Sequence, residues 1–171
     1  MAKLFMQELP TKDELRNSVT RLDQSADSSA LYANLLVLKV ANELENYMDS
    51  LLAPYNLSAG RFTLLFMLNN APEGLMPSEL SNKVGVTQAT ISGLLNGLEK
   101  AELVKREMHQ KDGRSFVIKI SEKGEALLKE LIPIWSPKIS EFWRTISAQE
   151  LDQIGGALEK LIKSVNILKV S

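Results

Sequence analysis

The chain has 171 residues, of which 44% are hydrophobic and 24% charged, and its formal net charge is −1. This length and composition are typical of a globular protein that buries a core in one domain or in one two-lobed unit. The absence of cysteine excludes disulfides, thiolate metal sites and thiol-based redox sensing, and a single histidine leaves little for any metal site.

The first third of the chain reads as helical. Thr11 and Glu14 have the spacing of a capping box, which predicts a short helix within an N-terminal extension of residues 1–27. Apolar residues then recur at steps of three and four from about residue 28 to residue 53, and Pro54 follows, so a long helix is expected there. Ser58 is placed to cap a further helix over about residues 59–70.

Residues 77–98 have the pattern of a helix, a tight turn and a second helix. Pro77 suits a first helical position because its missing N–H is no loss there. Gly85 can adopt the left-handed conformation that ends a helix, and Thr87 can then cap the next one. The segment therefore predicts a helix-turn-helix.

Two short strand patterns follow, over residues 103–108 and 115–120, with Asp112-Gly113 as a hairpin turn between them. Residues 76–120 carry seven Lys and Arg against five Asp and Glu, so this part of an otherwise acidic chain is basic. A basic hairpin suits contact with phosphates, although charge alone also fits an ordinary solvated hairpin.

The second helix of the pair exposes small and amide side chains, which suit base edges, and the hairpin adds cations for phosphates. The candidate DNA-contacting residues are Ser78 at the start of the first helix, Thr87, Gln88, Ala89, Thr90, Ser92, Gly93 and Asn96 in or beside the second, and Arg106, Lys111, Asp112 and Arg114 in the hairpin.

The last third is again helical. A helix from Ser121 is expected to be interrupted by Pro133 and Pro137, which makes it a kinked connector. Ser147 and Glu150 form a second capping box, and the apolar stripe that follows to residue 168 is long enough to need a partner helix. Packing within one subunit is the alternative way to cover that stripe.

Residues 30–168 resemble the multiple-antibiotic-resistance regulator (MarR) family of winged-helix proteins. The resemblance is carried by Leu57-Ser58-Ala59-Gly60-Arg61-Phe62, by Thr87-Gln88-Ala89-Thr90-Ile91-Ser92, by the wing sequence Asp112-Gly113-Arg114 and by Ser121-Glu122-Lys123-Gly124. It implies a homodimer joined by its terminal helices, a recognition helix in the major groove, a wing arginine in the minor groove and a small-molecule site between two lobes. The chain departs from the family at Gly93 and Gly97, where many members carry arginine, and at Glu102, where glycine is usual.

The fold class expected is mainly α with a small two- to three-stranded β-wing. Residues 57–121 form the winged helix-turn-helix DNA-binding domain in this interpretation, and residues 28–56 and 122–171 form a helical dimerisation region. Tyr47, Tyr55, Arg61 and Trp135 are candidates to line a site for a small aromatic or anionic effector, with Arg61 pairing a carboxylate. Aromatic residues at helical spacing are, however, more often part of the core.

The function expected is that of a sequence-specific transcriptional regulator, a repressor in the first instance, which binds a pseudo-palindromic operator in double-stranded DNA as a homodimer. A winged-helix protein-interaction module with weak or no DNA binding is the alternative. An enzyme is disfavoured because the sequence has no phosphate-binding loop, no nucleophile and base pair and no acidic cluster. No cofactor is expected, and without a signal peptide or an apolar span the expected location is cytoplasmic, with no membrane contact.

Overall fold

The computed structural model describes residues 6–108 and 115–168. The predicted fold class is confirmed, because the chain is mostly helical with one small antiparallel sheet. The α-helices are α1 (Lys12–Leu22), α2 (Ser28–Leu52), α3 (Ala59–Asn69), α4 (Pro77–Val84), α5 (Gln88–Lys100), α6 (Glu122–Trp143) and α7 (Ala148–Ser164). Two short 3₁₀ helices, η1 (Ala53–Tyr55) and η2 (Val165–Leu168), follow α2 and α7, and the strands are β1 (Val104–Met108) and β2 (Phe116–Ile120).

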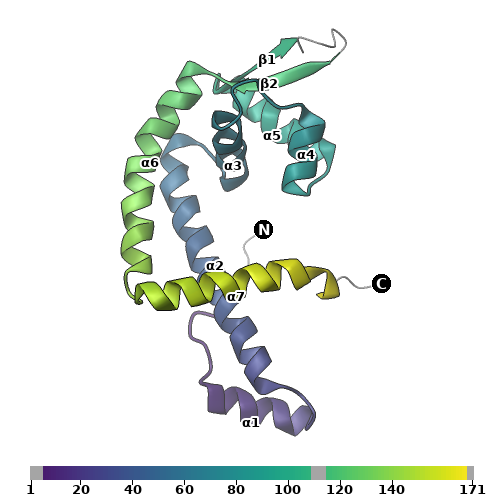
Figure 1. Cartoon of the computed structure of the whole chain (residues 1–171), viewed down its shortest axis with the longest axis vertical. Helices are drawn as coiled ribbons and strands as arrows, with labels where there is room; N and C mark the ends of the chain where they lie inside the picture. Colours follow the sequence, from purple (N-terminus) through teal and green to yellow (C-terminus); the bar gives the residue numbers. More distant parts are fainter. Residues whose placement is uncertain (1–5, 109–114, 169–171) are drawn as a thin grey trace.

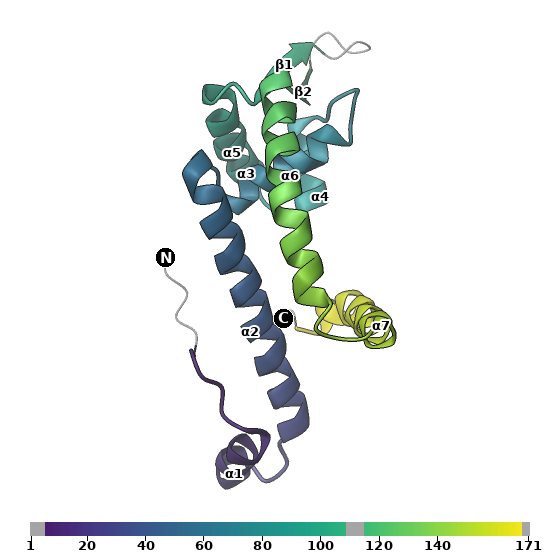
Figure 2. The ribbon, with the colours of Figure 1, turned by 90° about the vertical axis from the view of Figure 1, so that its left-hand side faces the viewer.

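The elements divide into a compact lobe and a set of long projecting helices. Helices α3, α4 and α5 and the two strands gather at one end of the molecule, and α2 and α6 both run away from that end (Figures 1 and 2). Helix α7 lies at the far end of α6, and α1 lies beyond it at the N-terminal end of α2.

The hydrophobic core lies in the compact lobe. Helices α1 and α7 contain no buried residue, and Leu52 is the one buried residue of α2. The fully buried side chains of the core are Leu52, Leu64, Leu65, Leu68, Leu80, Ile91, Leu95, Leu98, Ile118 and Leu131. The core therefore joins the lobe to the adjoining parts of α2 and α6, whereas α1 and α7 contribute no buried side chain to it.

The strands pair in antiparallel register, from Val104 opposite Ile120 to Met108 opposite Phe116. Leu75 adds a third, single-residue contact, because its N–H donates to the Ile118 carbonyl at 3.0 Å and its carbonyl accepts from the Ile118 N–H at 2.8 Å. The sheet therefore matches the expected two- to three-stranded wing.

Helix α6 corrects one expectation from the sequence. It runs unbroken from Glu122 to Trp143 with Pro133 and Pro137 inside it, rather than being interrupted by them. The prolines are four residues apart, so the two missing N–H groups lie on one side of the helix, where a bend can accommodate them. Figure 1 shows α6 as a single bowed helix.

Candidate nucleic-acid interface and adjoining pocket

The turn between α4 and α5 is built as the sequence indicates. Gly85 ends α4 in the left-handed conformation, with φ of 73°. The Ser81 hydroxyl, buried in the turn, donates to the Val86 carbonyl at 2.6 Å. Thr87 Oγ1 then accepts from the Thr90 N–H at 3.2 Å and so caps α5. These bonds fix the angle between the two helices and thereby fix which face of α5 is exposed.

The exposed face of α5 carries most of the candidate DNA-contacting residues. One side of the helix packs into the core through Ile91, Leu95 and Leu98. Ser78, at the start of α4, is half-buried. The candidates exposed in or beside α5 are Thr87, Gln88, Ala89, Thr90, Ser92, Gly93 and Asn96. These residues are uncharged, all but Ala89 and Gly93 have a polar side chain, and the Thr87 and Thr90 hydroxyls are 3.0 Å apart.

The strands of the wing carry paired charges. Glu107 accepts from Lys105 Nζ at 2.8 Å and from Lys119 Nζ at 3.0 Å. These two hydrogen bonds, first that from Lys105, lower the pKa of the Glu107 carboxyl. The candidate wing residues Lys111, Asp112 and Arg114 lie outside the described residues.

Arg106 on β1 is held by three neighbours. Its Nε and Nη2 donate to the two carboxylate oxygens of Glu99 at 2.6 and 2.8 Å, and Nη2 also donates to Asn96 Oδ1 at 3.2 Å. The guanidinium lies over the Phe116 ring, 4.7 Å from its centroid. The hydrogen bonds to Glu99 raise the pKa of Arg106 further. Two candidate DNA-contacting residues, Asn96 and Arg106, are thus bound to each other.

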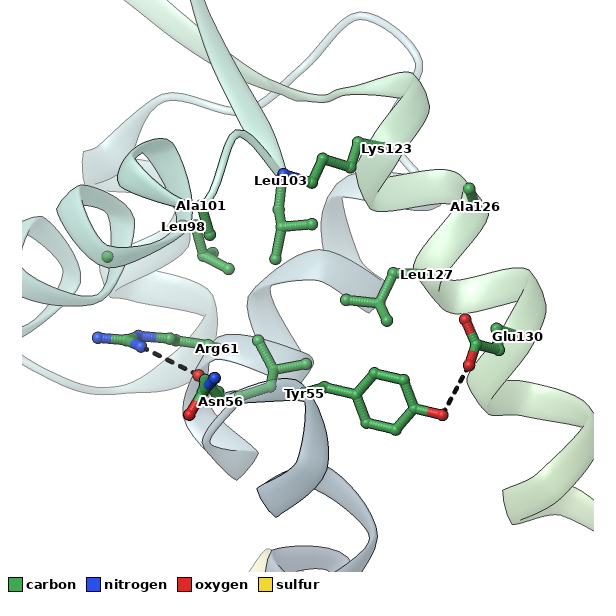
Figure 3. Close-up of a pocket in the computed structure, with 12 residues that line it drawn as sticks. Tyr55, Asn56, Arg61, Leu98, Ala101, Leu103, Lys123, Ala126, Leu127 and Glu130 are labelled. Carbon is green, nitrogen blue, oxygen red and sulfur yellow. Dashed lines mark hydrogen bonds between the residues drawn. The ribbon is translucent and has the colours of Figure 1, made fainter.

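A cavity of about 490 Å³ lies behind α5, between η1, α3, α5 and α6 (Figure 3). Its walls include Tyr55, Arg61, Lys123 and Glu130. The Tyr55 hydroxyl donates to Glu130 Oε1 at 2.8 Å, which raises the pKa of Tyr55. Arg61 Nη1 lies 3.5 Å from the Asn56 carbonyl, and Arg61 Nε is buried without a hydrogen-bond partner.

The structure brings together only two of the four candidate effector residues. Tyr55 and Arg61 line the cavity just described, whereas Tyr47 lines a separate hollow between α2 and α6. Trp135 is not among the residues that line the first cavity; it packs edge-on against Phe62 with a centroid separation of 6.0 Å, and its Nε1 is buried and unpaired.

The position of Arg61 explains why residue 97 is glycine, one of the departures from the family pattern. Its guanidinium rests on the backbone of α5 at Gly97, and a Cβ at that position would be 2.6 Å from Arg61 Nε. Glycine at position 97 therefore makes room for an arginine that comes from α3. Glu102, the third departure, has φ of 61°, the left-handed conformation that glycine adopts without cost.

Sequence reasoning missed Glu99 and Glu130 as partners within these sites. Glu99 is seven residues from Arg106 and on another element, so no helical spacing links them. Glu130 is 75 residues from Tyr55, and nothing in the sequence marks that contact. Within the described residues, no group of three or more His, Cys, Asp or Glu side chains could hold a metal ion. None of the helices described has the length and apolar character of a membrane span.

Comparison with known proteins identifies the family. The MarR family profile matches residues 55–115. The helix-turn-helix transcriptional repressor YetL of Bacillus subtilis is 31% identical over 144 residues, which are 84% of this chain and 86% of YetL. The chain belongs to the MarR family. It is a MarR-family transcriptional regulator, and this family is not one of enzymes.

Solved structures of MarR-family proteins share the fold. S. aureus MepR in complex with DNA has a TM-score of 0.70 and 22% identity, and the match covers 77% of this chain and 96% of MepR. A MarR protein of Peptoclostridium difficile has a TM-score of 0.69 and 24% identity, covering 82% and 90%. CouR of Rhodococcus jostii, bound to p-coumaroyl-CoA, has a TM-score of 0.67 and 20% identity, covering 75% and 90%.

Proposed function

We propose that this MarR-family regulator is a repressor that binds a pseudo-palindromic operator as a homodimer, with one α5 in the major groove of each half-site. The observation that carries the proposal is the exposed polar face of α5, fixed beside a wing whose tip sequence is basic. Amide and hydroxyl groups suit base edges, whereas cations suit phosphates. The repressor YetL and the DNA complex of MepR support this proposal.

Exposed apolar side chains support the homodimer. Helix α7 presents Leu161 with 59% and Ile162 with 70% of their surface exposed. Where α7 faces α2, an apolar hollow of about 580 Å³ is lined by Val37 and Val40 of α2 and by Leu158 of α7, among others. A helix with such a stripe is stable when another surface covers it. Residues 28–56 and 122–171 are thus the proposed dimerisation region, and 57–121 the proposed DNA-binding domain.

Selection of bound fragments from the source genome's DNA tests the proposal. We expect an enriched site with two half-sites about 10 bp apart, since the two-fold symmetry of the protein must match the duplex repeat. A monomer by sedimentation at micromolar concentration would contradict the dimer. An empty selection with retained binding to a protein partner would instead favour an interaction module.

The tip of the wing is proposed to enter the minor groove through Arg114, with Asp112 holding the turn. Arg114→Ala should weaken operator binding by about 1 to 3 kcal/mol. Lys111→Ala should weaken binding to all sequences alike and lower the salt slope by about one unit. If the Arg114→Ala variant binds the operator with unchanged affinity at fixed salt, the wing does not enter the groove.

The cavity behind α5 is the proposed effector site. Arg61 has an unused buried N–H and Lys123 adds a second cation, so an apolar molecule with a carboxylate fits the lining chemistry. Release requires that the effector binds the free dimer more tightly than the DNA-bound one. Aryl carboxylates such as benzoate are suitable probes, and equal affinity for the two forms would refute effector release.

A further inference from the structure

Arg106 joins the recognition helix to both strands of the wing. Its hydrogen bonds reach α5, it belongs to β1, and its guanidinium covers the Phe116 ring of β2. The Arg106 side chain is 40% exposed and that of Glu99 only 28%, so this pair is partly shielded from solvent. A two-point arginine–carboxylate bond has a defined geometry as well as a favourable energy.

The same guanidinium fixes the orientation of the Asn96 amide. Asn96 Oδ1 accepts from Arg106 Nη2, and the opposite amide orientation would place N–H donors against an N–H donor. Oδ1 therefore faces Arg106, and Nδ2 is on the other side of the amide carbon. No described residue accepts a hydrogen bond from Nδ2, and Asn96 is exposed on the α5 face proposed to meet DNA.

We propose that Arg106 is a positioning residue for sequence recognition, which turns the Asn96 amide so that its NH₂ group reads a guanine in the major groove. Guanine presents two neighbouring acceptors, N7 and O6, to such a donor. The familiar asparagine–adenine pair also needs the amide oxygen to accept from adenine N6, and here that oxygen is held by a cation. The inference rests on the proposed function, because it presumes that α5 enters the major groove.

The alternative is that Arg106 contacts a phosphate. A double variant separates the two roles: Glu99→Gln with Arg106→Gln removes the ion pair, keeps a polar side chain at both positions and leaves the net charge unchanged. The matched control is Glu125→Gln with Lys129→Gln, which removes an exposed ion pair of α6. Each protein is used for selection of bound sequences and for operator titration at several salt concentrations.

The positioning role predicts that the double variant loses about tenfold of the preference for guanine at one position of each half-site, with the salt slope unchanged. A phosphate contact predicts the reverse, namely a slope smaller by about one unit with base preferences intact. The control should match the wild type in both measurements. Intact base preferences in the double variant would overturn the proposal whatever the slope.

Asn96→Asp provides a second variant, on an exposed surface where folding is not at risk. It keeps the shape but only accepts hydrogen bonds, so guanine at that position should be replaced by a base with a donor, cytosine or adenine. Retained guanine preference in this variant would also overturn the proposal. A wild-type chain that selects no sequence would instead refute the proposed function.

Discussion

Glu102 has a backbone conformation that is unusual for a residue other than glycine. Its φ of 61° is a conformation in which glycine is unstrained, and its carboxylate pairs with Lys123 Nζ at 3.1 Å. Both side chains of that pair are mostly exposed, so the pair adds little to stability. The Glu102 carbonyl accepts a hydrogen bond from the Ser121 hydroxyl, and any residue at position 102 would retain this bond.

Glu102→Gly should therefore raise the free energy of unfolding by about 1 kcal/mol, because it relieves the left-handed conformation. The denaturant midpoint at constant m-value is the measurement. Glu102→Ala is the control, since it removes the ion pair but keeps the strain, and it should give no gain. If both variants raise the free energy of unfolding equally, relief of the left-handed backbone conformation is not the cause of the gain.

The two glycines of α5 provide a second comparison. A Cβ at Gly93 would meet nothing within 4 Å, whereas one at Gly97 would displace the Arg61 guanidinium. Gly93→Ala should raise the free energy of unfolding by about 1 kcal/mol through helix propensity. Gly97→Ala should raise the free energy of unfolding by less, because its methyl group displaces the Arg61 guanidinium. Identical unfolding midpoints for the two variants would show that this displacement costs no stability.

The candidate sites show which residue-level features a sequence reveals. The Thr87 cap, the Gly85 turn and the exposed α5 face follow from local spacing, and the structure has them as expected. The partnership of Arg106 with Glu99 depends on the angle at which β1 leaves α5. The place of Arg61 depends on how α3 packs against α5, which spacing along the chain does not encode.

At the scale of elements, local chemistry sets most of the boundaries. The capping boxes predicted at Thr11 and Ser147 are both present, with Glu14 and Glu150 accepting from the N-cap N–H groups at 2.8 Å. Local rules did not predict whether Pro133 and Pro137 interrupt α6, because a helix can bend around prolines when its other hydrogen bonds persist.

The start of α6 depends on a close approach to the wing. The Ser121 N–H donates to the Leu103 carbonyl at 3.0 Å, and a Cβ on Gly124 would collide with that same carbonyl oxygen. Gly124→Ala should lower the free energy of unfolding by about 2 kcal/mol, because backbone must move to admit the methyl group. The urea midpoint measures the loss, with Gly93→Ala as the control, and a gain in Gly124→Ala would mean that α6 does not pack this closely.

At the scale of the whole molecule, the sequence indicated that α7 has an apolar stripe in need of a partner helix, but it did not indicate how much other apolar surface is exposed. The periodicity of α7 predicted an uncovered apolar stripe, and the structure adds that α2 also exposes Leu36, Val37 and Val40. Which surfaces cover these side chains in the proposed dimer depends on the relative placement of two chains, and one sequence does not contain that information.

Leu158→Glu should convert the proposed dimer to a monomer, because it places a charge in the apolar hollow between α2 and α7. Sedimentation at micromolar concentration measures the change. Lys160→Glu, on the same helix but outside the residues that line the hollow, is the control and should leave the dimer intact. A dimeric Leu158→Glu variant would place the interface elsewhere.

The uneven placement of the core has a consequence for gene control. The compact lobe has its own buried side chains, whereas α7 has none, so dilution of the proposed dimer would separate two chains whose recognition helices are still folded. A single lobe would contact only one half-site of the proposed operator. At concentrations below the dimer dissociation constant, operator occupancy would then follow the square of the chain concentration. The regulated genes would respond to a twofold fall in the regulator's abundance with up to a fourfold fall in occupancy.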